Sequence, residues 1–463
     1  VNELGDPHSV YLTPALLKSL SERTSGRYAG VGAQIDIRDG WITIVSPMAG
    51  GPALAAGIRT GDRIIEVDGK PIHGVGLDEA QKALRGEPGS VVKLTIERPA
   101  VAAPLKFALT RGEVKVQSVQ HAQMLSDSIG YVALTIFSEE SAAGLRHAID
   151  SLRTAGMKTL LLDLRGDPGG LLDQGVSVSD LFLDPHQRIV SMRGRTPDAS
   201  RSFDDRMPQQ WPTMPVAVLV DSNTASAAEI VAGALQDHDR AVLLGSQTYG
   251  KGSAQNVFPL GEDGAVKLTI ALWYTPSGRS INKRRPSPDE PVPDTTSKTP
   301  PTYKTDSGRT VRGGGGIAPD VKLPPMKLTT SDTAFERALG KQIPQFRDAL
   351  TDYALSIKAN RSVTSPDFVV SQAMRDELYR RMRSRGVMLD SATYVASSGL
   401  VDRLLSYEVT RYVFGESAEY ARRLKDDPSV TATVKFLRGA TTEHELLAKA
   451  DSAAKTASTE NTK

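Results

Sequence analysis

Residues 115–325 alternate between short, mostly apolar runs and longer runs with helical periodicity, and this alternation restricts the fold more than any other feature. Two parallel strands need a crossover connection of a dozen or more residues, usually a helix. Apolar runs separated by helical patterns therefore predict an α/β layer in which much of the sheet is parallel. The expected strands lie at 129–137, 158–164, 216–220, 241–244 and 266–274, and the expected helices at 141–155, 171–183 and 225–236.

Two loops in this region suggest a catalytic site. Residues 223–229 read Asn-Thr-Ala-Ser-Ala-Ala-Glu where a strand turns into a helix, and residues 249–255 read Tyr-Gly-Lys-Gly-Ser-Ala-Gln after the next strand. Serine is a weak nucleophile until a base takes its proton, and lysine is a base only when it is neutral. Burial disfavours the ammonium form and lowers a lysine pKa by up to about 3–5 units. The segments suggest a Ser226/Lys251 hydrolase dyad, although a serine at a helix start is more often an N-cap.

The lysine loop also has a nucleotide-binding interpretation. Residues 245–251 match G-x-x-x-x-G-K, but a P-loop needs Ser or Thr after the lysine to hold magnesium, and this chain has Gly252. We expect residues 254–260 to be loop or extended chain, whereas a phosphate site needs a helix N-terminus there. The nucleotide interpretation is therefore poor.

Composition excludes several classes of function. The chain has 463 residues, enough for about three domains. Its formal charge of +2 does not indicate a nucleic-acid binder. It contains no run of about 18–20 apolar residues, so we expect no transmembrane segment in it. It has no cysteine, and its seven histidines lack metal-ligand spacing, so we expect no metal and no cofactor. The chain begins at Val1 without Met, and we expect that an upstream signal or anchor has been removed.

The segments outside the α/β region have different patterns. Residues 1–27 are expected to form a helical N-terminal cap, and residues 28–113 contain short strands and glycine turns. The α/β core is assigned to 114–325. Residues 326–463 are predicted to be helical, with a small, polar tail from residue 449 that we expect to be frayed. This last region contains no chemical motif, so we expect it to serve packing, dimerisation or adaptor docking.

Residues 28–113 resemble a PDZ domain. The resemblance rests on Gly-Val-Gly-Ala at 30–33, on the Ser-Pro…Ala-x-x-Ala-Gly-Ile helix entry at 46–58, and on Gly-Asp-Arg-Ile-Ile-Glu-Val-Asp-Gly-Lys at 61–70. Such a domain adds an extended peptide to a sheet edge and holds the terminal carboxylate with backbone amides. A small β-rich scaffold that binds no peptide is the alternative. The resemblance places the carboxylate loop at Ala29, Gly30, Val31 and Gly32.

A glycine pair follows the strand expected at 158–164. Adjacent glycines at a strand-to-helix turn let the backbone approach a ligand and leave amide donors free, although a plain tight turn is equally compatible with the pair. Acyl transfer needs such donors for the developing oxyanion, and one donor can contribute about 3–4 kcal/mol. The candidates are the amides of Gly169, Gly170 and Ala227.

Five segments, in this order along the chain, resemble carboxyl-terminal processing peptidases, which are tail-specific serine endopeptidases. The first is Asp-Pro-His-Ser-Val-Tyr-Leu-Thr-Pro at 6–14, and the PDZ-like segment follows it. The other three are Asp-Leu-Arg-Gly-Asp-Pro-Gly-Gly at 163–170, Thr-Ala-Ser-Ala-Ala-Glu from 224, and Gly-Lys-Gly-Ser-Ala-Gln at 250–255. The resemblance covers about residues 1–325. It implies an α/β protease core with an inserted β-rich PDZ-like domain, followed here by a C-terminal helical module.

The resemblance also implies roles for individual residues. Ser226 is the expected nucleophile, Lys251 the general base and Gln255 the side chain that orients the lysine. Gly169 or Gly170, with the Ala227 amide, is the expected oxyanion hole. The family commonly has Ser-Ala-Ser-Ala-Ser-Glu around the nucleophile, whereas this chain has Thr and Ala at the outer serine positions and keeps only the central serine.

The expected function is cleavage of unstructured or C-terminal segments of proteins, with the PDZ-like domain capturing the substrate C-terminus. Arg85 resembles a PDZ arginine that couples peptide occupancy to activity. The expected partners are proteins or peptides with an exposed C-terminus, an adaptor protein and a second copy of the chain, with no nucleic acid. The resemblance implies a bacterial periplasm or cell-envelope location. The alternative is a catalytically silent or adaptor-dependent peptide-binding scaffold.

Overall fold

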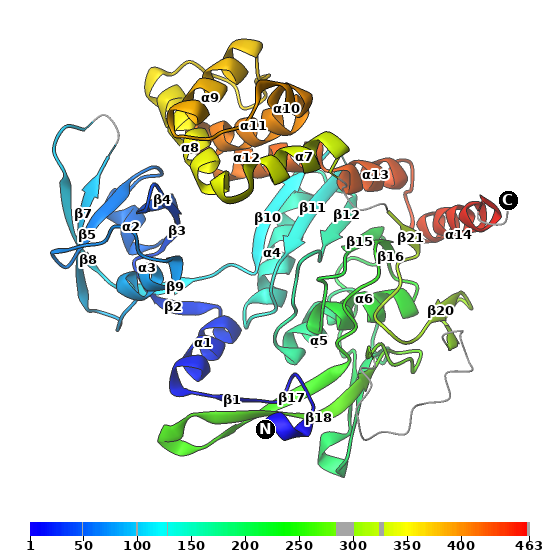
Figure 1. The fold of residues 1–463 in the computed structure, drawn as a ribbon. Helices are drawn as coiled ribbons and strands as arrows, with labels where there is room; N and C mark the ends of the chain where they lie inside the picture. Colours follow the sequence, from blue (N-terminus) through cyan, green and yellow to red (C-terminus); the bar gives the residue numbers. More distant parts are fainter. Residues whose placement is uncertain (49, 99–100, 127, 284–300, 324–327, 461–463) are drawn as a thin grey trace. The chain divides into compact units, whose positions relative to one another are not determined.

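The computed structural model describes residues 1–48, 50–98, 101–126, 128–283, 301–323 and 328–460 (Figure 1). The chain forms two compact units. One unit comprises Val1–Gly26, Val116–Pro325 and Pro428–Lys463, and the other comprises Arg27–Lys115 and Met326–Asp427.

A six-stranded sheet forms the centre of the first unit. Its five consecutive strands from β11 to β21 are parallel, and β10 pairs antiparallel at one edge. Every residue of β11, β12, β15 and β16 is buried, as expected for parallel strands covered on both faces. The predicted parallel α/β layer is therefore confirmed. In spatial order the strands are β10 (Val119–Met124), β11 (Ile129–Leu134), β12 (Thr159–Asp163), β15 (Val216–Val220), β16 (Val242–Gly245) and β21 (Val321–Lys322).

Three helices connect the parallel strands: α4 (Ser141–Thr154), α5 (Leu172–Asp180) and α6 (Ala227–Asp237). Helices α5 and α6 pack against each other, and a Cβ on Gly175 would lie 3.2 Å from the Ala227 carbonyl oxygen, so glycine permits their close approach. All residues of α6 are buried. The helix is therefore enclosed by the core although it carries polar side chains such as Glu229, and the candidate nucleophile lies at its start.

A second, antiparallel sheet contains β17 and the N-terminal strand β1. The residues expected to form only a helical cap contribute β1 as well as α1, because Val10 pairs with Lys267 of β18. Three residues are too few to show a strand pattern, so only the partner strand reveals β1. The sheet order is β1 (Val10–Leu12), β18 (Ala265–Tyr274), β13 (Arg188–Gly194) and β14 (Arg201–Asp204), and β17 (Ser253–Pro259) also pairs with β18. The same unit contains helix α1 (Pro14–Ser25) and the hairpin of β19 (Thr302–Lys304) and β20 (Thr310–Arg312).

The last two helices belong to the first unit, so the helical region predicted at 326–463 divides between the units. Helix α13 spans Pro428–Leu437 and α14 spans Glu443–Glu460. A 3.2 Å ion pair joins Glu443 to the buried Arg240, and α14 contacts β16 and β21. The helix reaches Glu460 where we expected a frayed tail from residue 449, because Leu446 and Ala450 are buried and Ala-rich sequence favours helix.

The second unit contains the PDZ-like sheet. One of its edge strands is β3, which pairs with β4. The sheet order is β3 (Ala33–Arg38), β4 (Trp41–Pro47), β5 (Arg63–Val67), β7 (Val91–Glu97) and β8 (Leu105–Thr110), with β6 (Lys70–Pro71) on β5, a separate pair of β2 (Arg27–Gly30) and β9 (Gly112–Lys115), and helices α2 (Pro52–Ala55) and α3 (Leu77–Leu84).

Six helices share this unit with the PDZ-like sheet and have their own apolar core. Helices α8 and α11 pack closely, and α8 also contacts β3, where Arg347 forms a 2.6 Å ion pair with Asp36. The helices are α7 (Thr330–Leu339), α8 (Ile343–Asn360), α9 (Gln372–Ser384), α10 (Ser391–Ala396), α11 (Ser398–Phe414) and α12 (Glu416–Asp426).

Candidate active site

Three loops that carry candidate residues leave the carboxyl ends of neighbouring parallel strands. Strands β12, β15 and β16 lie side by side (Figure 1), and the glycine pair, Ser226 and Lys251 follow them in that order. Open α/β sheets bind ligands at this edge, because the carboxyl ends of parallel strands and the loops that follow them gather there. The topology therefore collects the three candidate loops at one place.

Ser226 lies in a strained turn between β15 and α6. Its backbone has φ 56° and ψ −118°, which an L-residue rarely adopts. Such a conformation costs about 1–3 kcal/mol and persists only where surrounding contacts enforce it. Ala227 is the first helical residue, and its amide has no recorded acceptor in the described part of the chain. The strained turn thus places a hydroxyl beside a free donor.

Glu229 joins the nucleophile loop to the lysine loop. One carboxylate oxygen accepts the amides of Ser226 at 2.8 Å and Lys251 at 2.9 Å. The other accepts the Thr248 hydroxyl at 2.6 Å and the Gly250 amide at 2.7 Å. Sequence reasoning assigned no role to Glu229, although a glutamate three residues after a serine at a helix start is the capping-box pattern.

The carboxylate of Glu229 is wholly buried. Burial is the largest influence on its pKa and raises it, while the four donors oppose that shift. Removing a carboxylate from water costs free energy, but its hydrogen bonds to four donors are strong and restrict the positions of those donors. Glu229 therefore fixes the two loops relative to each other.

Lys251 has the electrostatic environment of a base. Burial lowers the pKa of its amine, and the nearby Lys267 and Arg23 act in the same direction, whereas Glu229 and Asp6 oppose it. A lowered pKa increases the neutral fraction that can accept a proton. No hydrogen bond joins the Lys251 amine to the Ser226 hydroxyl among the described residues.

Gln255 lies on β17, close after the lysine. Its Nε2 donates to the hydroxyls of Ser253, at 2.9 Å, and Thr269, at 3.2 Å. The described residues contain no hydrogen bond between Gln255 and Lys251, so this structure does not directly join the expected orienting pair. The β17 strand agrees with the extended chain expected after Lys251, and it leaves no helix N-terminus there for a nucleotide phosphate.

The glycine loop packs directly against the nucleophile turn. The Asp167 carbonyl accepts the Ala225 amide at 2.9 Å. Gly169 has φ +84°, and a Cβ there would lie 2.8 Å from the Ser226 Cβ and 2.7 Å from the Ala227 nitrogen. Only glycine fits so close to the turn without strain.

The two glycine amides differ in their hydrogen bonding. The Gly169 amide donates to the Asp167 carboxyl at 2.7 Å. The Gly170 amide has no recorded acceptor within the described ranges. Gly170 and Ala227 are therefore the candidates with donors to offer an oxyanion, whereas Gly169 provides the close approach.

Asp167 is a second buried acid beside the nucleophile that sequence reasoning did not select. Its side chain is fully buried, and one carboxyl oxygen lacks a hydrogen-bond partner in the described structure. Burial raises its pKa to about 8, with the Gly169 amide opposing the shift. Asp167 is thus expected to hold a proton at neutral pH.

The PDZ-like unit places the expected carboxylate loop at the start of its edge strand. Ala29 and Gly30 end β2, and the carbonyls of Val31 and Gly32 accept the amides of Ala53 and Met48 at 2.8 and 2.9 Å. The Val31 and Gly32 amides have no recorded acceptor in the described ranges. The loop thus has donors of the kind that a terminal carboxylate requires.

Arg85 lies at the C-terminal end of α3, next to this loop. Its guanidinium lies 4.8 Å from the centre of the Tyr28 ring, a cation–π arrangement, and Tyr28 belongs to β2. The Leu84 carbonyl would lie 3.6 Å from a Cβ on Gly30. The arginine is therefore positioned beside the expected peptide site.

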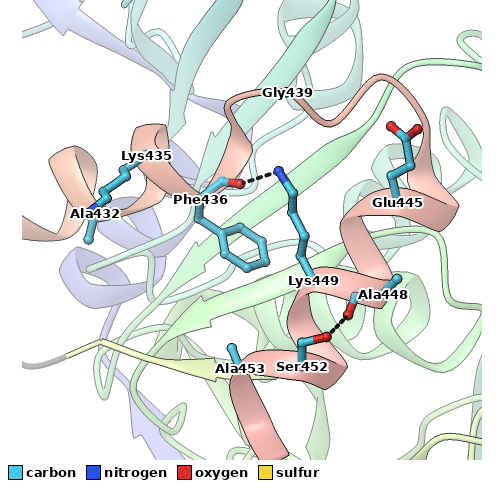
Figure 2. Close-up of a pocket in the computed structure, with 9 residues that line it drawn as sticks. All are labelled: Ala432, Lys435, Phe436, Gly439, Glu445, Ala448, Lys449, Ser452 and Ala453. Atoms are coloured by element: carbon cyan, nitrogen blue, oxygen red, sulfur yellow. Dashed lines mark hydrogen bonds between the residues drawn. The ribbon is translucent and has the colours of Figure 1, made fainter. Parts of the chain in front are cut away.

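A groove of about 740 Å³ lies elsewhere, between α13 and α14 (Figure 2). Its lining includes Phe436 and Lys449, whose amine donates to the Phe436 carbonyl at 3.4 Å. None of the candidate catalytic residues lines it.

Within the described ranges no group of three or more His, Asp or Glu side chains could hold a metal ion. No helix in those ranges has the length and apolar character to cross a membrane.

Comparisons with known proteins identify the family of the chain. Residues 128–292 match the model of Peptidase family S41, and residues 43–98 match a PDZ domain model. The carboxy-terminal-processing protease of Bartonella bacilliformis is 42% identical over 297 residues, covering 62% of this chain and 68% of the relative. The carboxy-terminal processing protease CtpA of Bacillus subtilis is 38% identical over 320 residues, covering 67% of this chain and 68% of the relative.

A solved photosystem II D1 C-terminal processing protease is 30% identical and covers 73% of this chain and 83% of its own, with a TM-score of 0.40. The relatives support a protease and not the catalytically silent scaffold. The chain belongs to peptidase family S41, as a serine peptidase of the carboxy-terminal processing type with a PDZ domain.

Proposed function

We propose that this peptidase cleaves unstructured or C-terminal segments of proteins through a Ser226/Lys251 dyad. The observation that carries the proposal is the single Glu229 oxygen that accepts the amides of both residues. This shared acceptor brings the nucleophile loop and the base loop to one point at the carboxyl edge of the sheet. The strained Ser226 turn and the lowered Lys251 pKa support the same assignment.

The mechanism follows from the roles of these groups. Neutral Lys251 accepts the hydroxyl proton as Ser226 attacks the peptide carbonyl. The Gly170 and Ala227 amides bind the oxyanion of the tetrahedral intermediate. Lys251 then protonates the leaving amine and activates water, which hydrolyses the acyl-enzyme. The rate should therefore rise from acid to alkaline pH as the lysine loses its proton.

The PDZ-like unit is proposed to capture the substrate C-terminus. An extended peptide would add to the free edge of β3, and the Val31 and Gly32 amides would hold its carboxylate. Arg85 is proposed to communicate peptide occupancy to the catalytic unit. If Arg85→Ala leaves both the basal and the peptide-stimulated rate unchanged, this role for the arginine is wrong.

We also propose a periplasmic or cell-envelope location, an adaptor protein and self-association. Bacterial relatives of the processing type support the location. Fractionation of a bacterial host would test the location, and light scattering with and without candidate adaptors would test assembly.

The decisive experiment measures cleavage of an unfolded protein with an apolar C-terminus. Wild type, Ser226→Ala and Lys251→Ala are compared with and without added C-terminal peptide. Cleavage by wild type that disappears in both variants supports the dyad. Cleavage that persists in Ser226→Ala would refute Ser226 as the nucleophile.

A further inference from the structure

An N-terminal turn is connected by hydrogen bonds to the strands behind the lysine. One Asp6 carboxylate oxygen accepts the hydroxyls of Ser9 and Thr269, each at 2.6 Å. Ser9 in turn accepts the Thr269 amide at 3.0 Å, and Thr269 accepts Nε2 of Gln255 at 3.2 Å. Asp6 and Thr269 are 263 positions apart in the sequence, so the connection is purely tertiary.

The chemistry of these groups sets the direction of each hydrogen bond. A carboxylate can only accept, so the single Thr269 hydroxyl hydrogen is used on Asp6. The Thr269 oxygen must then accept a hydrogen from Gln255, and only the amide nitrogen can donate one. Burial opposes ionisation of Asp6, but bonds from Ser9, Thr269 and the His8 amide outweigh it and hold the pKa of Asp6 below its usual value.

The orientation of the Gln255 amide is therefore determined by its surroundings. Its nitrogen faces Thr269 and Ser253, both of which accept from it. Among the described residues the side-chain carbonyl oxygen of Gln255 has no hydrogen-bond donor, and an ammonium or amine N–H needs an acceptor. We propose, on the basis of the dyad proposed above, that Asp6 acting through Thr269 is a positioning residue that presents the Gln255 carbonyl oxygen to Lys251.

The charges around Lys251 give this proposal a distinct signature. Lys267 from β18 and Arg23 from α1 favour the neutral amine, whereas Glu229 from α6 and Asp6 from the N-terminal turn favour the ammonium. Removing the Asp6 charge should lower the pKa of Lys251. The acid limb of the pH–rate profile should then move to lower pH, which a simple loss of folding cannot produce.

Matched variants at Thr269 test the hydrogen-bond relay. Thr269→Val has the same shape but no hydroxyl, and Thr269→Ser restores the hydroxyl. We expect Thr269→Val to lower kcat about 10–100-fold with KM little changed, because small displacements of a catalytic group have effects of that size. Thr269→Ser should recover most of the rate, and Asp6→Asn should shift the acid limb to lower pH.

The Gln255→Ala background separates positioning from a general structural role. Thr269→Val should cause no further loss of kcat there, because the group that Thr269 orients has been removed. An equal loss in both backgrounds, full activity of Thr269→Val, or an unmoved acid limb in Asp6→Asn would overturn the proposal. Ser226→Ala is included in the same assay: if it retains activity, the dyad itself is wrong, which is a different failure.

Discussion

Replacing Glu229 by glutamine tests whether one buried carboxylate holds the catalytic loops together. The four hydrogens that converge on Glu229 divide into two pairs, one for each carboxylate oxygen. A glutamine has one carbonyl oxygen, so its NH₂ group must face one of these pairs. If the NH₂ faces the Ser226 and Lys251 amides, both are left without an acceptor.

The size of the effect follows from these bonds. Two hydrogen bonds to a charged group contribute about 3–6 kcal/mol together. Burial disfavours the charged form of Glu229, which raises its pKa, so a neutral side chain recovers part of this loss. We expect a net destabilisation of about 2–4 kcal/mol and a loss of at least tenfold in kcat.

Urea unfolding followed by tryptophan fluorescence measures the destabilisation, because Trp211 and Trp273 are buried in the same unit. Glu262→Gln is the matched control, since it makes the same charge change at an exposed position, where we expect less than about 0.5 kcal/mol. If Glu229→Gln unfolds and cleaves like Glu262→Gln, the bridging role of the carboxylate is refuted.

Two further predictions concern the glycine loop. Gly169→Ala should abolish cleavage, since its Cβ would lie 2.6 Å from the Ala225 oxygen. Gly166→Ala is the control: it also has a left-handed backbone, at φ +70°, but no atom lies within 4 Å of its Cβ, so it should lose only about 1 kcal/mol of stability. Similar activity in the two variants would contradict the packing argument. For Asp167, the pKa of about 8 lies above its usual value, so its contribution to stability is complete below about pH 4 and is lost as pH rises to about 8. The stability of Asp167→Asn relative to wild type should therefore rise between pH 5 and pH 8, by up to about 1.4 kcal/mol per pH unit, as measured by urea unfolding. If the difference in unfolding free energy between the two proteins does not change with pH, Asp167 is not protonated in the folded state.

Local sequence was sufficient for the inner strands β11, β12, β15 and β16 because buried parallel strands are continuously apolar, whereas the short edge strands β10 and β21 were not predicted. The runs around Leu160 and Val218 contain little else, and helical periodicity separates them. The short strand β1 had no such signal, because its three residues become a strand only by pairing with β18. The division of the C-terminal helices between two units was also unpredictable, since it depends on contacts such as Glu443 with Arg240.

The candidate site divides in the same way. Ser226, Lys251 and the glycine pair could be identified because each lies in a short motif whose chemistry is local. Glu229 was visible in the motif, but three of its four partners lie in the lysine loop, 19 to 22 positions further along the chain, and meet it only in the fold. The difference between Gly169 and Gly170 depends on which amide the Asp167 carboxyl accepts, and adjacent glycines look alike in sequence.

The sequence by itself determined the parallel α/β layer, the PDZ-like segment, the family and the residue types needed for acyl transfer, because apolar periodicity and short motifs are properties of neighbouring residues. Only the tertiary structure decided how these residues are held. Asp6 reaches Thr269 across 263 positions, and one Glu229 oxygen receives amides from two loops. Hydrogen-bond partners are selected by distance and direction in space, which separation along the chain does not encode.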